Sequence, residues 1–233
     1  QRYAYREFGM WQRVLTQFRV VVFYLTLVVF PMPERLNLIH WVRTSSGLFD
    51  PATTTLAVTT LSCLVGVAIL QARRHPVAAF GALFLLLHLV IESTIVNLEM
   101  IFEHRMYLPM VGIALGSAGL AMDSAMTTRA VKFTAVPLVI LLGIWTMERN
   151  LVWRDEVILW SDVIHKNAHH ARPVYNRGHA LRRAHMFDRA EHDYLEAIRR
   201  ESYVQAYTNL ANMYAELGRF DEAIGLLDQA IAL

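Results

Sequence analysis

Long apolar runs dominate the first part of the chain. Segments 51–72, 76–96 and 131–147 are almost entirely hydrophobic, and segment 107–122 is shorter but rich in Gly and Ala. A helix needs about 20 mostly apolar residues to cross the hydrocarbon core of a bilayer, and small residues are typical of packed membrane helices. The pattern therefore predicts four membrane-spanning helices at these positions.

A fifth span is predicted at 14–30, where the signal is weaker. The uninterrupted apolar run is only 20–30, and Arg19 precedes it. A longer helix still spans if the Arg19 side chain extends to the membrane interface. Pro31 and Pro33 would end that helix. A re-entrant or interfacial helix is the alternative for this segment.

A different pattern begins near residue 148, where small residues recur at a fixed interval. Four positions repeat with an offset of 33, namely Asn176, Gly178, Ala190 and Ala197 against Asn209, Ala211, Ala223 and Ala230. Small side chains at this spacing let antiparallel helices approach closely, and a period of about 34 is typical of the tetratricopeptide repeat. We predict repeats at about 171–203 and 204–233. A capping helix is predicted at 151–167, and further repeats are expected beyond Leu233, because at least about three are needed for stability.

Composition supports this division. The chain is 55% hydrophobic and 18% charged, whereas soluble domains have about a quarter charged residues. Of the 20 Asp and Glu residues, 7 lie in 1–147 and 13 in 148–233. The predicted fold class is all-α, with a multi-spanning membrane helix bundle at 1–147 and a tetratricopeptide-repeat solenoid at 148–233. One cysteine excludes a disulfide scaffold, and a net charge of +2 argues against nucleic acid as a partner.

Basic residues in short loops predict the orientation, because they favour the cytoplasmic side. If the helices alternate, three basic groups share that side: Arg2, Arg6 and Arg13; Arg73 and Arg74; Arg129 and Lys132. Loops 31–50 and 97–106 then lie on the opposite side together with the repeats. The sequence thus predicts an integral membrane protein with a periplasmic or lumenal repeat domain.

The segment from Ile91 to Gly112 holds the candidate chemistry. Glu92 lies within a predicted span, where a carboxylate is costly and often functional. On one continuous helix Glu99 and Glu103 would share its face, so a proton, a metal ion or a cation should compensate their repulsion. Tyr107 suits the membrane interface.

Three interpretations of this segment remain open. In the first, Arg105 pairs with Glu103 in a structural corner that joins the two halves of the chain. In the second, Arg105 and His104 bind an anionic group such as a lipid phosphate. In the third, His104 and the carboxylates of Glu99 and Glu103 hold a divalent cation; no other cofactor is indicated.

The repeats present a second set of candidates. Repeat arrays bind extended peptides or helices on a concave face, and four arginines of the first repeat would suit an acidic protein partner: Arg172, Arg177, Arg182 and Arg183. An ordinary solvated surface is the alternative. His165 and His169 are four residues apart, but no second pair completes a metal site, and we predict none.

The string Phe102-Glu103-His104-Arg105-Met106-Tyr107-Leu108-Pro109 resembles the Glu-basic-Arg-x-Tyr-x-Pro segment of the transmembrane and tetratricopeptide-repeat O-mannosyltransferases and their bacterial relatives. The resemblance continues through Arg149-Asn150, the Trp-containing helix that follows, and Tyr175-Asn176-x-Gly178. It covers about residues 90–233 and is specific in its order of elements.

This resemblance implies a GT-C type glycosyltransferase, which moves a sugar from a polyprenyl-phosphate carrier to a Ser or Thr hydroxyl. The family's acidic catalytic loop has no counterpart in this chain, so no catalytic residue is assigned. Glu99, Glu103, His104, Arg105 and Tyr107 are expected to line the carrier-phosphate site. The setting implied is a bacterial inner membrane, with the repeats in the periplasm. The alternative is a non-catalytic, membrane-anchored repeat scaffold that docks on a larger complex, and a transporter is a third, weaker alternative.

Overall fold

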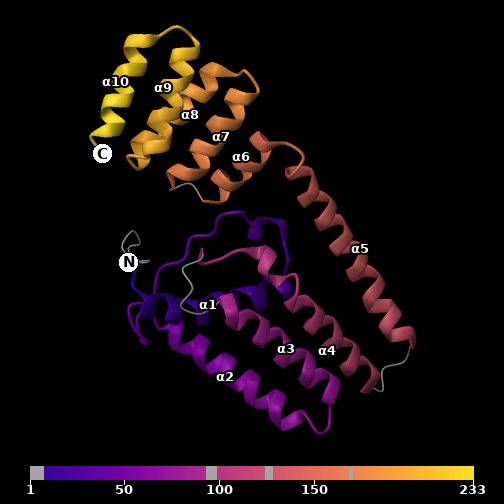
Figure 1. The fold of residues 1–233 in the computed structure, drawn as a ribbon. Coiled ribbons are helices and arrows are strands. Elements are labelled where there is room, and N and C mark those ends of the chain that lie inside the picture. Colours follow the sequence, from indigo (N-terminus) through magenta and orange to yellow (C-terminus); the bar gives the residue numbers. More distant parts are fainter. Residues whose placement is uncertain (1–7, 93–98, 124–127, 168–169) are drawn as a thin grey trace. The chain divides into compact units, whose positions relative to one another are not determined.

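The computed structural model describes residues 8–92, 99–123, 128–167 and 170–233, and within them the regular structure is entirely helical (Figure 1). The chain divides into two compact units, Gln1–Trp145 and Thr146–Leu233. The first unit contains α1 (Met10–Val29), α2 (Thr53–Gln71), α3 (Pro76–Glu92), α4 (Pro109–Asp123) and most of α5 (Thr128–Val152), with the short 3-10 helices η1 (Pro33–Arg35) and η2 (Glu103–Met106). The boundary between the units thus falls inside α5.

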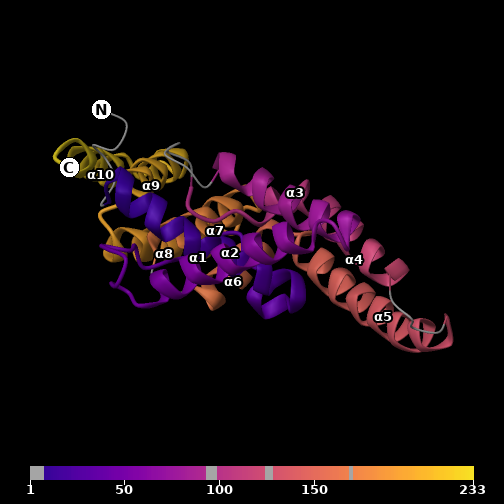
Figure 2. The same ribbon diagram turned by 90° about the horizontal axis from the view of Figure 1, so that it is seen from below.

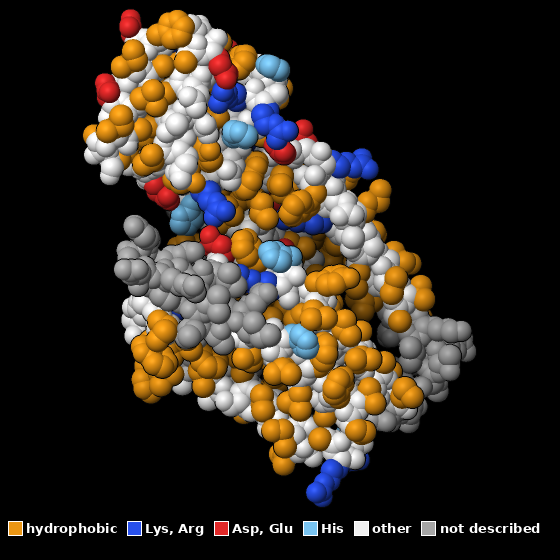
Figure 3. Space-filling model, in the orientation of Figure 1, with side chains coloured by type: hydrophobic (Ala, Val, Ile, Leu, Met, Phe, Trp, Pro, Cys, Tyr) orange, Lys and Arg blue, Asp and Glu red, His pale blue; other side chains and the backbone are white. Residues whose placement is uncertain are grey.

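Three of these helices are long and apolar enough to cross a membrane: α1, α2 and the part of α5 from Ala135 to Val152. Helices α3 and α4 are apolar but shorter. Much of the apolar surface is exposed, and Figure 3 shows hydrophobic side chains covering a large part of the first unit. Contiguous exposed apolar surface on this scale marks a surface that contacts lipid or another protein.

Glycines allow the closest helix contact of the first unit, between α3 and α4. A methyl group built on Gly81 or Gly112 would collide with backbone of the opposite helix, because the two glycines face each other. Gly116 and Gly119 extend the same approach along α4. Small residues let helix backbones pack at this distance, which explains why segment 107–122 is rich in them.

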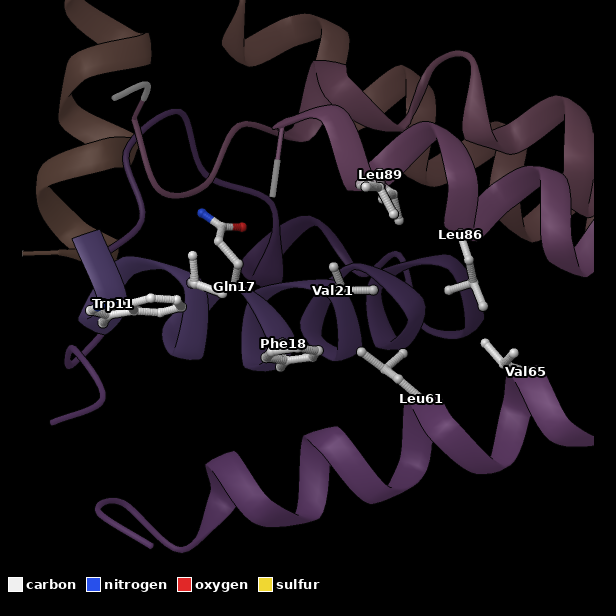
Figure 4. Close-up of a pocket in the computed structure, with 10 residues that line it drawn as sticks. Trp11, Gln17, Phe18, Val21, Leu61, Val65, Leu86 and Leu89 are labelled. Carbon is white, nitrogen blue, oxygen red and sulfur yellow. The ribbon is translucent and has the colours of Figure 1, made fainter. Parts of the chain in front are cut away.

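Helix α1 departs from the expected alternation. Thr16 and Thr54 both hydrogen-bond Ser45, at 2.8 Å each, and further along the two helices Val21 and Leu61 line one pocket. Helices α1 and α2 therefore run in the same general direction, as Figure 4 shows, whereas α2, α3 and α4 alternate in direction (Figures 1 and 2).

The location of Arg13 contradicts the predicted side of the N-terminal flank. Its side chain is fully buried and its Nη1 lies 3.8 Å from the Met100 sulfur. Met100 belongs to the 97–106 loop, which the alternation rule assigned to the opposite side. The physical reason is the polar face of α1, where Arg13, Thr16 and Gln17 are buried and require hydrogen-bond partners. This arrangement favours the interfacial alternative for α1.

The second unit is a stack of helical hairpins. Helix α6 (Glu156–Lys166) precedes the pair α7 (Ala171–Arg183) and α8 (Phe187–Arg200), which is followed by α9 (Val204–Glu216) and α10 (Phe220–Ile231). Six alanines lie in the core between them, beside larger side chains such as Leu181, Tyr194 and Leu210: Ala171, Ala190, Ala197, Ala206, Ala211 and Ala223.

The turns inside the two hairpins share one backbone conformation. Gly218 has a φ of 77°, and His185, 33 residues earlier, has a φ of 58°. Glycine adopts this left-handed region without steric penalty, but the first repeat places a histidine there, which is uncommon for a residue with a side chain.

Candidate functional site

Glu103 joins two loops of the first unit. Its Oε1 accepts a hydrogen bond of 2.6 Å from the backbone N–H of Asn37, and it lies 2.7 Å from Nε2 of His40. Neither Asn37 nor His40 was indicated by the sequence, because they are more than 60 positions away from Glu103. The pairing fastens the turn at η2 to the segment between α1 and α2.

Side chains of helix α1 hold the backbone that leads into this turn. The buried hydroxyl of Tyr24 accepts a hydrogen bond from the N–H of Phe102 at 2.8 Å and donates one to the Phe102 carbonyl at 3.1 Å. Gln17 donates to the carbonyl of Met100 at 3.1 Å. A segment without regular structure is thus held by side chains that replace backbone pairing.

Arg105 turns back over the same segment. Its Nη1 donates to the carbonyl of Glu99 at 2.8 Å, and its guanidinium lies 5.2 Å from the centre of the Phe102 ring. The His104 ring also packs on Phe102, with 4.9 Å between ring centres. Tyr107, which follows η2 and precedes α4 by two residues, is 85% exposed. Glu99, Glu103, His104, Arg105 and Tyr107 therefore lie on one short stretch of surface.

The three glutamates do not share one continuous helix. The described part of α3 reaches Glu92, Glu99 has no regular secondary structure, and Glu103 begins η2 after an extended residue. The side chain of Glu92 lies outside what the structure describes, as does His169. Among the described residues, no group of three or more His, Cys, Asp or Glu side chains is arranged to hold a metal ion, so the geometry gives no support to a divalent cation held by Glu99, Glu103 and His104.

An apolar pocket of about 500 Å³ lies between α1, α2 and α3 (Figure 4). Gln17 supplies the polar edge of this pocket and also holds the Met100 carbonyl. The remaining lining is hydrophobic: Trp11, Val14, Phe18, Val21, Leu61, Val65, Leu86, Leu89 and Val90. Gln17 therefore contacts both the pocket and Met100, which lies three residues before the η2 turn.

Residues 204–233 match the tetratricopeptide repeat family. The chain is also similar to Protein O-mannosyl-transferase Tmtc3 of Drosophila melanogaster, with 30% identity over 139 residues. The matched region covers 56% of this chain and 15% of the relative, so the chain spans only a small part of that protein's length. Both findings agree with a repeat-containing protein that resembles a glycosyltransferase.

The repeat arginines are already paired inside the repeat unit. Arg177 binds both carboxylate oxygens of Asp193, at 2.7 and 2.8 Å, and this hydrogen bonding raises the pKa of the Arg177 guanidinium. Arg182 pairs with Glu216 on α9, and Arg183 pairs with Glu156 on α6 at 3.0 Å. These pairs brace neighbouring helices. That Arg172, Arg177, Arg182 and Arg183 bind a partner stays a prediction.

Proposed function

We propose that this chain is the membrane-anchored, repeat-bearing part of a GT-C type glycosyltransferase that uses a polyprenyl-phosphate sugar donor. In this proposal the first unit binds the donor and the repeats hold the acceptor or another protein partner. The similarity to a protein O-mannosyl-transferase supports the reaction class. Catalytic residues are not assigned within the chain.

The observation that carries the proposal is a polar turn and an apolar pocket, with Gln17 in contact with both the pocket and Met100. A polyprenyl phosphate is an amphiphile, with one anionic end and a long hydrocarbon chain. The guanidinium of Arg105, with His104 beside it, suits the phosphate, because charge-assisted hydrogen bonds to phosphate are strong. The pocket next to Gln17 suits the first isoprene units, since its lining is otherwise apolar and its volume is within the range of small-molecule sites.

Membrane placement is part of the proposal. Helices α2, α3, α4 and α5 cross the bilayer, and the turn with Arg73 and Arg74 faces the cytoplasm. The η2 turn and the repeats lie on the opposite side, which is the periplasm if the protein belongs to a bacterial inner membrane. Exposed Tyr107 then lies at the interface, where amphipathic aromatic rings are favoured.

Photolabelling tests donor binding. The chain is reconstituted in lipid nanodiscs and irradiated with a prenyl phosphate that carries a benzophenone on its hydrocarbon tail. We expect labelled peptides from α1 and α3, and protection by unlabelled prenyl phosphate but not by the corresponding prenol. Arg105→Gln should reduce labelling, and the control Arg74→Gln should not. Equal protection by phosphate and alcohol, or labelling unaffected by Arg105→Gln, would remove the proposed phosphate site.

A scaffold role is the second candidate, and one surface favours it. Phe220, Ile224 and Ile231 on α10 are exposed, whereas Phe187 and Ile198 of α8, the counterparts of Phe220 and Ile231 33 residues earlier, pack against the core of the repeat unit. An exposed apolar helix face of this kind binds another helix, which belongs either to a following repeat or to a partner protein. If photolabelling fails while Ile224→Asp abolishes co-purification of a defined membrane partner, the scaffold is the better description.

A further inference from the structure

A second cavity, of about 490 Å³, lies between α1 and the N-terminal half of α2. Residues 40–42, from the segment that joins the two helices, form part of its wall. Its lining is mixed. Apolar side chains such as Leu56 and Ala57 alternate with Arg19, Thr26 and Thr60. This cavity differs from the pocket of Figure 4, which is almost purely apolar.

Arg19 has an unusual environment for a half-buried cation. Its Nη1 donates to the backbone carbonyl of Arg43 at 2.7 Å and lies 3.5 Å from the Ser45 hydroxyl. In the part of the chain that the structure describes, no carboxylate is within ion-pair distance of Arg19, and Asp50 is paired with Arg43 instead. A guanidinium on an apolar helix is costly without an anion, and it still has N–H groups to donate.

The neighbouring surface is typical of a membrane interface. Trp41, which lines the cavity, is 65% exposed. Trp and Tyr concentrate where hydrocarbon meets headgroups. His40 also lines the cavity, but its Nε2 already faces Glu103, which leaves Arg19 as the charged group available to a ligand.

From this geometry we infer that the cavity binds the phosphate of an anionic membrane phospholipid. Arg19 is the phosphate ligand, and the acyl chain lies along Leu56 and Thr60. The site is separate from the donor site around Arg105. It rests on the proposed membrane placement of α2 but not on glycosyl transfer.

Native mass spectrometry of the chain in a mild detergent tests this inference. The chain is titrated with phosphatidylglycerol, with diacylglycerol of the same acyl chains, which lacks the phosphate, and with glycerol 3-phosphate as the headgroup alone. We expect retention of one phosphatidylglycerol with about tenfold preference over diacylglycerol, the ratio that corresponds to one charge-assisted hydrogen-bonded pair between Arg19 and the phosphate. Glycerol 3-phosphate should neither bind nor compete.

Four variants locate the site. Arg19→Gln should abolish the preference, Arg19→Lys should keep most of it, and Arg74→Gln, an exposed arginine of the α2–α3 turn, should leave it unchanged. Thr60→Trp fills the cavity while leaving Arg19 in place, and it should abolish retention of the lipid. A preference that survives both Arg19→Gln and Thr60→Trp, or competition by glycerol 3-phosphate, would overturn the inference.

The result is separable from the donor proposal. Loss of phosphatidylglycerol preference in Arg19→Gln with photolabelling intact supports this site by itself. Intact lipid preference without photolabelling removes only the donor site. Release of the chain from membranes by alkaline carbonate would remove both.

Discussion

The α3–α4 contact gives the sharpest quantitative expectation, through the substitution Gly112→Ala. The added Cβ would lie 2.5 Å from the Gly81 carbonyl oxygen and 2.9 Å from the Leu85 nitrogen. Ordinary contact begins at 3.4 Å, so the helices must separate by the difference, about 0.9 Å. Both colliding atoms belong to backbone and cannot rotate away.

Overpacking of this kind costs about 1–3 kcal/mol, and the better helix propensity of alanine offsets up to about 1 kcal/mol of it. We expect a net loss of about 1–2 kcal/mol in the free energy of unfolding of the first unit. For a chain of this size, that loss corresponds to a fall in Tm of roughly 2–8 °C.

Gly66→Ala is the matched control, since nothing lies within 4 Å of its added Cβ. The same chemical change should there raise stability slightly, by about 0.5–1 kcal/mol. The assay is thermal unfolding in detergent followed by circular dichroism. Equal effects of the two substitutions, or a stabilised Gly112→Ala, would show that the two helices are not packed at the distance described.

Three further expectations concern side chains that stabilise the fold within one unit or the other. Tyr24→Phe removes both hydrogen bonds to Phe102 and should lower stability by about 2 kcal/mol in the same thermal assay; an unchanged Tm would contradict the clamp. Arg177→Met leaves the Asp193 carboxylate, 2% exposed, without its bidentate partner and should cost about 3 kcal/mol. Adding Asp193→Leu should recover part of that loss. Burial raises the pKa of Tyr194 to about 12 from about 10 in an unfolded chain, so the folded state favours the neutral phenol. The stabilisation is complete below pH 10 and is lost as the pH rises through 12; Tyr194→Phe should flatten this part of the pH profile, measured by circular dichroism of the repeat helices.

The repeats were predictable because their determinants are local and periodic. Ala190 and Ala223 recur at the right interval, and both are buried. The turn at His185 was not predictable, because the sequence marks the same conformation with glycine only at Gly218. Propensity favours glycine at that position, but the first repeat adopts the same backbone conformation with a histidine.

The candidate site was predicted only in part, for a physical reason. The turn from Glu103 to Tyr107 was identified from its own residues, since charges beside an apolar run are conspicuous. Asn37 and His40 were missed because pairing across a fold leaves no periodic signal. The interfacial alternative for α1 was open from the sequence, and the buried Arg13 argues for it. The length of an apolar run predicts an apolar helix. It does not predict the direction in which that helix runs.

The shared direction of α1 and α2 has a topological consequence. If α2, α3 and α4 cross a bilayer, then α1 lies wholly on the side of the η2 turn and adds nothing to the crossing count. A reporter fused ahead of Met10 would then sense the same compartment as one inserted near Tyr107. If α1 crossed the bilayer, the reporter ahead of Met10 would lie in the other compartment, and the location of every later loop would be unchanged.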